Sequence, residues 1–105
     1  MEFFDKKRIS VILEKACRDQ VVKLLEDSGT SGFTVYKEIY GKGQSGARGD
    51  YGSLNDVSGN LEIVSITGPE VAARILQGLA AMIDKGVVLI VHVADVKVIR
   101  NDHFK

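Results

Sequence analysis

A strand–helix–strand pattern occurs twice in this chain, and this repeat constrains the fold more than any other feature of the sequence. Alternating apolar residues predict strands, and apolar residues at helical spacing predict helices. The expected strands cover 8–13, 33–40, 61–67 and 87–93, with helices that end at Gly29 and Gly86. Two such units pack most simply as an α+β ferredoxin-like βαββαβ sandwich, a four-stranded antiparallel sheet with two helices on one face.

The helix boundaries have recognisable signals. Gly29 and Gly86 stand where a helix needs a left-handed residue to end. Thr67 is expected to cap the second helix, because Pro69 and Glu70 follow it at the positions typical of a first helical turn. Cys17 falls on the apolar stripe of the first helix, which predicts a small buried thiol.

The last strand is apolar on both faces. Val88 and Ile90 point one way, whereas Leu89 and Val91 point the other. Two helices can cover only one side of the sheet, and a strand that is apolar on both faces is typical of burial on both. We therefore expect self-association through the open face into a closed cyclic oligomer. A monomer with an exposed apolar sheet is the alternative.

The length and the amino-acid composition of the chain exclude several classes of protein. The 105 residues fit one domain, 1–105, and the 14 Lys and Arg balance the 14 Asp and Glu, which argues against nucleic acid as a partner. Neither a signal peptide nor an apolar run long enough to span a bilayer is evident, so no membrane insertion is expected. The only cysteine, Cys17, cannot form an internal disulfide. This usage favours a reducing, cytoplasmic compartment.

A long, polar, glycine-dense loop, about 41–60, follows the second strand. Its glycines at 41, 43, 46, 49 and 52 leave backbone amides open to a ligand such as phosphate, and Lys42 and Arg48 add charge. The spacing matches neither a Walker loop nor the dinucleotide fingerprint. A flexible linker is the alternative interpretation. Arg100, in the C-terminal tail, is a second candidate anion contact, or else a solvated charge.

Catalysis is not supported by the residues. No nucleophile stands in a recognisable pattern with a base, and the isolated His92 and His103 do not make a zinc site. His92, within an apolar strand, is expected in the core or an interface. An acylphosphatase would need an arginine in the turn after the first strand, where the chain has Glu14-Lys15-Ala16-Cys17. An RNA-binding module of this fold would need exposed aromatics on its central strands.

A resemblance to a known family rests on three short motifs. Gly32-Phe33-Thr34-Val35 opens the second strand, Gly41-Lys42-Gly43 opens the long loop, and Val98-Ile99-Arg100 leads into the tail. With these motifs the chain resembles the PII signalling superfamily over nearly its whole length. The resemblance implies a homotrimer that binds adenine nucleotides in clefts between neighbouring subunits, and a T-loop that corresponds to the glycine-dense segment.

The same resemblance implies which residues form the site. The nucleotide-binding positions are Thr34, Gly41, Lys42, Gly43, Arg48, Gly86 and Arg100. Asp50 and Tyr51, in the loop, are candidates for contact with a target protein, a transporter or an enzyme.

The segment Asp84-Lys85-Gly86-Val87 lacks the glycine-aspartate-glycine-lysine clamp of standard PII proteins. The chain is therefore more similar to the PII-like branch associated with bicarbonate transporters or carboxysomes. Members of that branch bind ADP, AMP or cyclic AMP, and ATP and bicarbonate are further candidate ligands. An interaction module that binds no nucleotide remains the alternative to this regulatory role.

Overall fold

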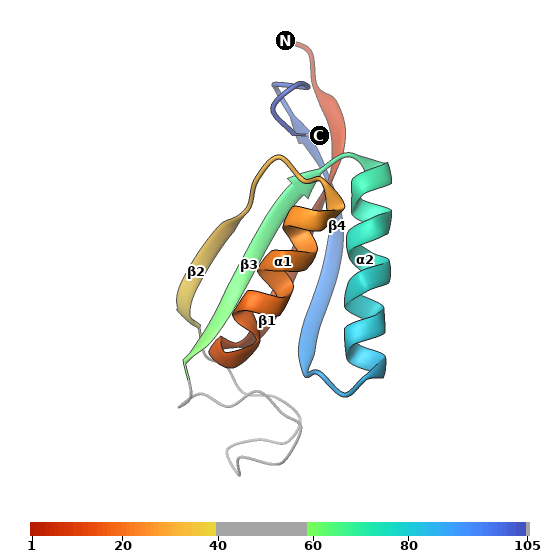
Figure 1. Cartoon of the computed structure of the whole chain (residues 1–105). Coiled ribbons are helices and arrows are strands. Elements are labelled where there is room, and N and C mark those ends of the chain that lie inside the picture. Colours follow the sequence, from red (N-terminus) through yellow and green to blue (C-terminus); the bar gives the residue numbers. More distant parts are fainter. Residues whose placement is uncertain (40–58, 105) are drawn as a thin grey trace.

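A computed structural model describes residues 1–39 and 59–104, which form one sheet with two helices packed on a single face (Figure 1). The elements in chain order are β1 (Phe4–Glu14), the short 3-10 helix η1 (Lys15–Cys17), α1 (Arg18–Ser28), β2 (Thr34–Ile39), β3 (Asn60–Thr67), α2 (Pro69–Asp84) and β4 (Leu89–Val98). The four strands lie in the order β2-β3-β1-β4, and every neighbouring pair is antiparallel. The predicted ferredoxin-like fold is confirmed.

The core lies between the sheet and the two helices. Alternate residues of β1, namely Ile9, Val11 and Leu13, point toward the helices and are almost fully buried. They pack against apolar residues of β3 and both helices: Val21, Leu25, Leu61, Ile63, Ala72, Ile75 and Leu79. Burying a side chain of this size stabilises the fold by about 1.5–3 kcal/mol. The two periodicities in the sequence therefore do predict the core.

The first and last strands of the chain reach further than predicted. β1 begins at Phe4 and β4 continues to Val98, so that the two strands form a two-stranded ribbon beyond the end of β3 (Figure 1). Two ion pairs between cross-strand partners, Lys7 with Asp95 and Lys97 with Asp5, hold this ribbon together. On the β1 side of this ribbon the residues 5–7 are all charged, so this half of the ribbon has no apolar alternation that would predict a strand.

Both glycine signals are confirmed. Gly29 and Gly86 have φ angles of 91° and 97°, in the left-handed region. At the end of α2 the Gly86 amide donates to the Ile83 carbonyl at 2.9 Å, and the Val87 amide donates to the Met82 carbonyl at 3.1 Å. These two bonds form a Schellman motif, which satisfies carbonyls that the helix end would otherwise leave free.

Three details differ from expectation. Gly68, not Thr67, occupies the cap position of α2, and Thr67 is instead the last residue of β3 and fully buried. Cys17 lies in η1 rather than on the stripe of α1, and is half-buried against the core. Ile83 follows the buried Leu79 at helical spacing, which predicts the inner face of α2, but its side chain is 44% exposed.

The second face of the sheet carries no helix among the described residues. Direct cross-strand partners share a face, so Thr34, Val64, Ser10 and His92 form one row across this open face. Ile90, in the next row, is 51% exposed. The prediction that the helices cover only one face is confirmed. His92 lies on this open face in the edge strand β4 and is exposed in the single chain rather than placed in its core, whereas Ser10 and Val64 on the two central strands of the same row are buried.

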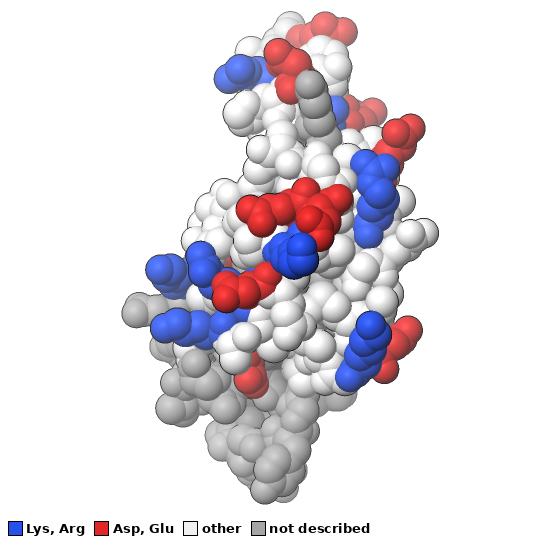
Figure 2. Space-filling model, in the orientation of Figure 1, with Lys and Arg blue, Asp and Glu red and all other residues white. Residues whose placement is uncertain are grey.

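The helix-bearing face has positive and negative side chains interspersed over both helices (Figure 2). Neither described helix is long and apolar enough to cross a membrane. Within 1–39 and 59–104, His, Cys, Asp and Glu side chains form no cluster that could hold a metal ion.

Candidate functional site: a hollow between the sheet and the C-terminal tail

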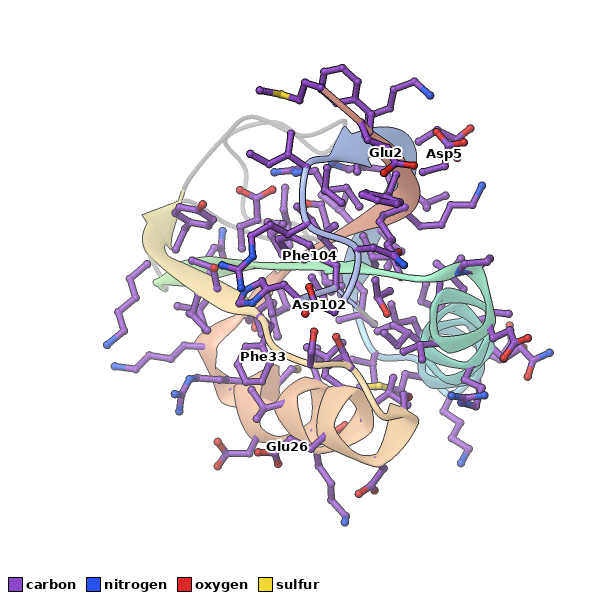
Figure 3. The ribbon with its side chains drawn as sticks, turned by 90° about the horizontal axis from the view of Figure 1, so that it is seen from above. Glu2, Asp5, Glu26, Phe33, Asp102 and Phe104 are labelled. Atoms are coloured by element: carbon purple, nitrogen blue, oxygen red, sulfur yellow. The ribbon has the colours of Figure 1, made fainter. Side chains whose placement is uncertain are left out.

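The C-terminal tail is joined to the segment that precedes β2. The Ser31 hydroxyl donates a hydrogen bond to the main-chain carbonyl of His103 at 2.7 Å. The rings of His103 and Phe104 meet edge to face, with centroids 4.7 Å apart and an interplanar angle of 80°. Viewed from above, Phe33 lies between β2 and α1, whereas Phe104 lies farther from the helices (Figure 3). The tail thus forms a wall at the open face.

A hollow of about 350 Å³ lies between this tail and the sheet. Its described lining comprises Arg8, Ser31, Gly32, Phe33, Thr34, Tyr36, Val64, Ile66, His103 and Phe104. The strand register explains this set, because Thr34 pairs with Val64 and Arg8 pairs with Ile66 across adjacent strands. The hollow therefore combines an apolar wall with a few polar groups, which is the usual composition of a small-molecule site.

The polar groups of the hollow differ in how far they are already engaged. Ser31 is bonded to the tail, whereas the hydroxyl of Thr34 and the guanidinium of Arg8 make no hydrogen bond or ion pair with the described residues. Arg8 is the only arginine or lysine in the described lining. Beside the hollow, the buried Ser10 hydroxyl donates to the Glu62 carboxylate at 2.5 Å. A ligand can thus hydrogen-bond to Thr34 and pair with Arg8.

The three described residues that were predicted to bind nucleotide, Thr34, Gly86 and Arg100, do not line one hollow within a single chain. Thr34 lines the hollow, and Arg100 is exposed in the tail that follows β4. Gly86 lies in the turn between α2 and β4. The remaining predicted residues, Gly41, Lys42, Gly43, Arg48, Asp50 and Tyr51, lie outside the described part of the chain.

The described candidate residues lie at opposite ends of the sheet. β2 begins at Thr34 beside the tail and ends at Ile39, roughly 17 Å away at the usual rise per strand residue. The turn at Gly86 lies at that far end, because Leu89 pairs with Leu13 and Leu13 with Leu61, next to the start of β3. Figure 1 shows the end of β2, the start of β3 and the turn before β4 at the end farthest from the termini. Within one chain, Thr34 and Gly86 therefore lie at separate places.

Several lining residues were not identified from the sequence. Arg8, Val64, Ile66 and Phe104 join Thr34 only through strand register and through the folded position of the tail. The one available signal was Arg8 itself, a charged residue at the edge of an apolar alternating run.

Comparisons with known proteins agree with this fold. The family described as nitrogen regulatory protein P-II matches residues 6–103. A structure of CPII from Thiomonas intermedia K12 bound to ADP, AMP and acetate superposes with a TM-score of 0.82 at 22% identity, covering 99% of this chain and 98% of that chain. A structure of CPII from the same organism bound to ADP and bicarbonate superposes with a TM-score of 0.81 at 24% identity, covering 99% of this chain and 98% of that chain.

A structure described as a PII-like signalling protein from Thermus thermophilus gives a TM-score of 0.78 at 26% identity and covers 100% of both chains. A comparison with curated protein sequences gives no match.

Proposed function

This chain belongs to the P-II family of nitrogen regulatory proteins, and we propose that it is a non-catalytic sensor that binds an adenine nucleotide in clefts between the subunits of a homotrimer. ADP and AMP are the leading ligands, because the similar CPII structures contain them. ATP and cyclic AMP are further candidates. Proteins of this family are generally signalling proteins rather than enzymes.

The observation that carries the proposal is the hollow beside the tail. Its volume of about 350 Å³ is within the range of small-molecule sites. Val64, Ile66 and Phe104 offer apolar surface for a planar base, and Thr34 offers a free hydroxyl at the same place. Thr34 is also a position at which the sequence predicts nucleotide contact. The hollow therefore supports one half of a nucleotide site.

The second half would come from a neighbouring subunit. Thr34 and the tail lie at one end of the sheet, whereas Gly86 and the ends of β2 and β3 lie at the other. A closed ring with a head-to-tail contact brings opposite ends of successive copies together. The exposed Ile90 on the open face adds apolar surface that such a ring would bury. A homotrimer accounts for both features.

Signalling would pass through the segment 41–60. In this proposal Gly41, Lys42, Gly43 and Arg48 contact the nucleotide, and Asp50 and Tyr51 contact a target protein, either a transporter or an enzyme. The nucleotide can switch target binding only if it has different affinities for two states of the segment. A role in inorganic-carbon metabolism is supported by the similar CPII bound to bicarbonate. A cytoplasmic, carboxysome-associated setting fits that role.

Calorimetric titration with ADP, AMP, ATP and cyclic AMP, with and without bicarbonate, tests the proposed nucleotide binding. Light scattering, which measures the mass of the protein in solution, tests the proposed trimer. Thr34→Val should weaken AMP binding about fivefold, because it removes one hydrogen bond, and Thr34→Ser should restore it. The expected mass is that of three chains. A folded protein that binds none of the four nucleotides would overturn the proposal.

A further inference from the structure

Arg8 occupies an unusual position for a cation. It lies within β1 and is half-buried on the open face of the sheet. Its partners across the two adjacent strands are Ile66 and Ala94, neither of which is polar. The apolar stem of an arginine can lie along such neighbours while its guanidinium reaches outward. Here the side chain lines the hollow beside the tail.

No described carboxylate neutralises this guanidinium. Lys7, the next residue, pairs with Asp95, and Lys97 pairs with Asp5 on the same ribbon. Arg8 has no such partner within 1–39 and 59–104. The carboxylate of Glu62 faces the same side of the sheet but accepts a hydrogen bond from Ser10. A half-buried arginine with no ion-pair partner among the described residues therefore lines a hollow of ligand size.

We propose that Arg8 binds the phosphate of the nucleotide that occupies this hollow, and so makes the site select nucleotides over nucleosides. This inference rests on the proposed function. A guanidinium holds phosphate through two parallel hydrogen bonds, and partial burial strengthens the charge interaction relative to open solvent. The base then packs on the apolar wall of Val64, Ile66 and Phe104. Arg8 is thus a specificity-determining residue that none of the sequence motifs included.

The experiment compares AMP with adenosine, which has the same base and sugar but no phosphate. Both ligands are titrated against the wild-type protein and against Arg8→Gln and Arg8→Lys. Arg8→Gln should weaken AMP binding at least about tenfold and change adenosine binding less than about twofold. The AMP affinity of Arg8→Lys should lie between those of the wild type and Arg8→Gln, because lysine keeps the positive charge but cannot form two parallel hydrogen bonds.

Lys6→Gln provides the matched control. Lys6 lies two residues before Arg8, on the same face of β1, and it does not line the hollow beside the tail. The variant Lys6→Gln removes one positive charge from the same strand as Arg8→Gln does, so it measures any long-range electrostatic effect on AMP binding. At about 0.15 M salt it should change AMP affinity less than about twofold.

The outcomes separate the two proposals. Suppose that the wild-type protein binds AMP. If Arg8→Gln weakens the binding of AMP and adenosine equally, or weakens the binding of neither, the assignment of Arg8 is overturned and the nucleotide site stands. An equal loss in Lys6→Gln and Arg8→Gln also overturns the assignment. If the folded wild-type protein binds neither AMP nor adenosine, both proposals fall. Retained adenosine binding by Arg8→Gln shows in the same titration that the variant is folded.

Discussion

The Ser31 hydroxyl donates a 2.7 Å hydrogen bond to the main-chain carbonyl of His103, 72 residues further along the chain. This bond joins the segment before β2 to the C-terminal tail, whose described residues, 99–104, form no strand or helix. Terminal segments are poorly ordered unless something ties them to the domain. The bond therefore places His103 and Phe104 as a wall of the hollow.

Removing the Ser31 hydroxyl should loosen the tail without unfolding the protein. Ser31→Ala deletes an exposed hydrogen bond, so the free energy of unfolding should fall by at most about 1 kcal/mol. Hydrogen exchange at the amides of 101–104 should become several-fold faster, because the tail loses its attachment. Ser31→Thr keeps the hydroxyl and is the control. Unchanged tail exchange in Ser31→Ala would show that other contacts hold the tail.

A charge placed on the open face should disrupt the proposed trimer. Ile90 and Ile83 are similarly exposed in the single chain, at 51% and 44%, but Ile90 lies on the open face of the sheet and Ile83 on the helix side. Ile90→Asp should give a lower mass by light scattering, because burying an unpaired carboxylate is strongly unfavourable. Ile83→Asp should keep the wild-type mass. Equal masses for the two variants would contradict an interface on this face.

The contribution of Gly86 to the stability of the fold should come from its backbone conformation and not from a lack of space for a side chain. A Cβ added at Gly86 or at Gly32 would meet no heavy atom within 4 Å, but only Gly86 has a positive φ, of 97°. Gly86→Ala should lower the free energy of unfolding by about 1 kcal/mol, because an L-residue is strained in the left-handed region. Gly32→Ala, measured in the same urea titration, should change it by less than about half as much. A larger loss for Gly32→Ala would disprove this explanation.

The ribbon at the chain termini should respond to acid through Asp5. The hydrogen bond from Lys97, together with its charge, lowers the pKa of the Asp5 carboxyl below its ordinary value. A lowered pKa in the folded state adds stability above the unfolded pKa, and that contribution is lost as the pH falls through the folded value. Lys97→Met should therefore raise the pKa of Asp5, measured by NMR of the carboxyl carbon. Its stability difference from wild type should shrink below about pH 4.

Lys7→Met, on the same ribbon, provides the control variant for that measurement. Lys7 pairs with Asp95 and acts on Asp5 only through its charge, so Lys7→Met should raise the pKa of Asp5 less than Lys97→Met does. An unchanged Asp5 titration in Lys97→Met would show that the ion pair does not form in solution.

The order of helices and strands could be predicted because it depends on local periodicity. Ile9, Val11 and Leu13 alternate, and all three point into the core. The ribbon formed by the first residues of β1 and the last of β4 could not be predicted in this way. Residues 5–7 of β1 are all charged and carry no apolar alternation, and their pairing with β4 becomes evident only when the two ends of the chain meet.

The candidate site was predicted only in part. Thr34 belongs to the motif Gly32-Phe33-Thr34-Val35 on which the resemblance rests, and it does line the hollow. Arg8 and Phe104 were missed, because they reach Thr34 through pairing between distant strands and through the bond of the tail to Ser31. The glycines and charges of 41–58 remain predictions.

The sequence by itself determined the two strand–helix–strand units, the glycines that end both helices and the resemblance to PII proteins. These properties depend on residues near one another in the chain, such as Gly86 with the last turn of α2. Only the tertiary structure decided that Arg8 and Thr34 face one hollow, and that Gly86 lies at the opposite end of the sheet. Strand register is set by non-local packing, and a shift of one residue would turn Arg8 to the other face.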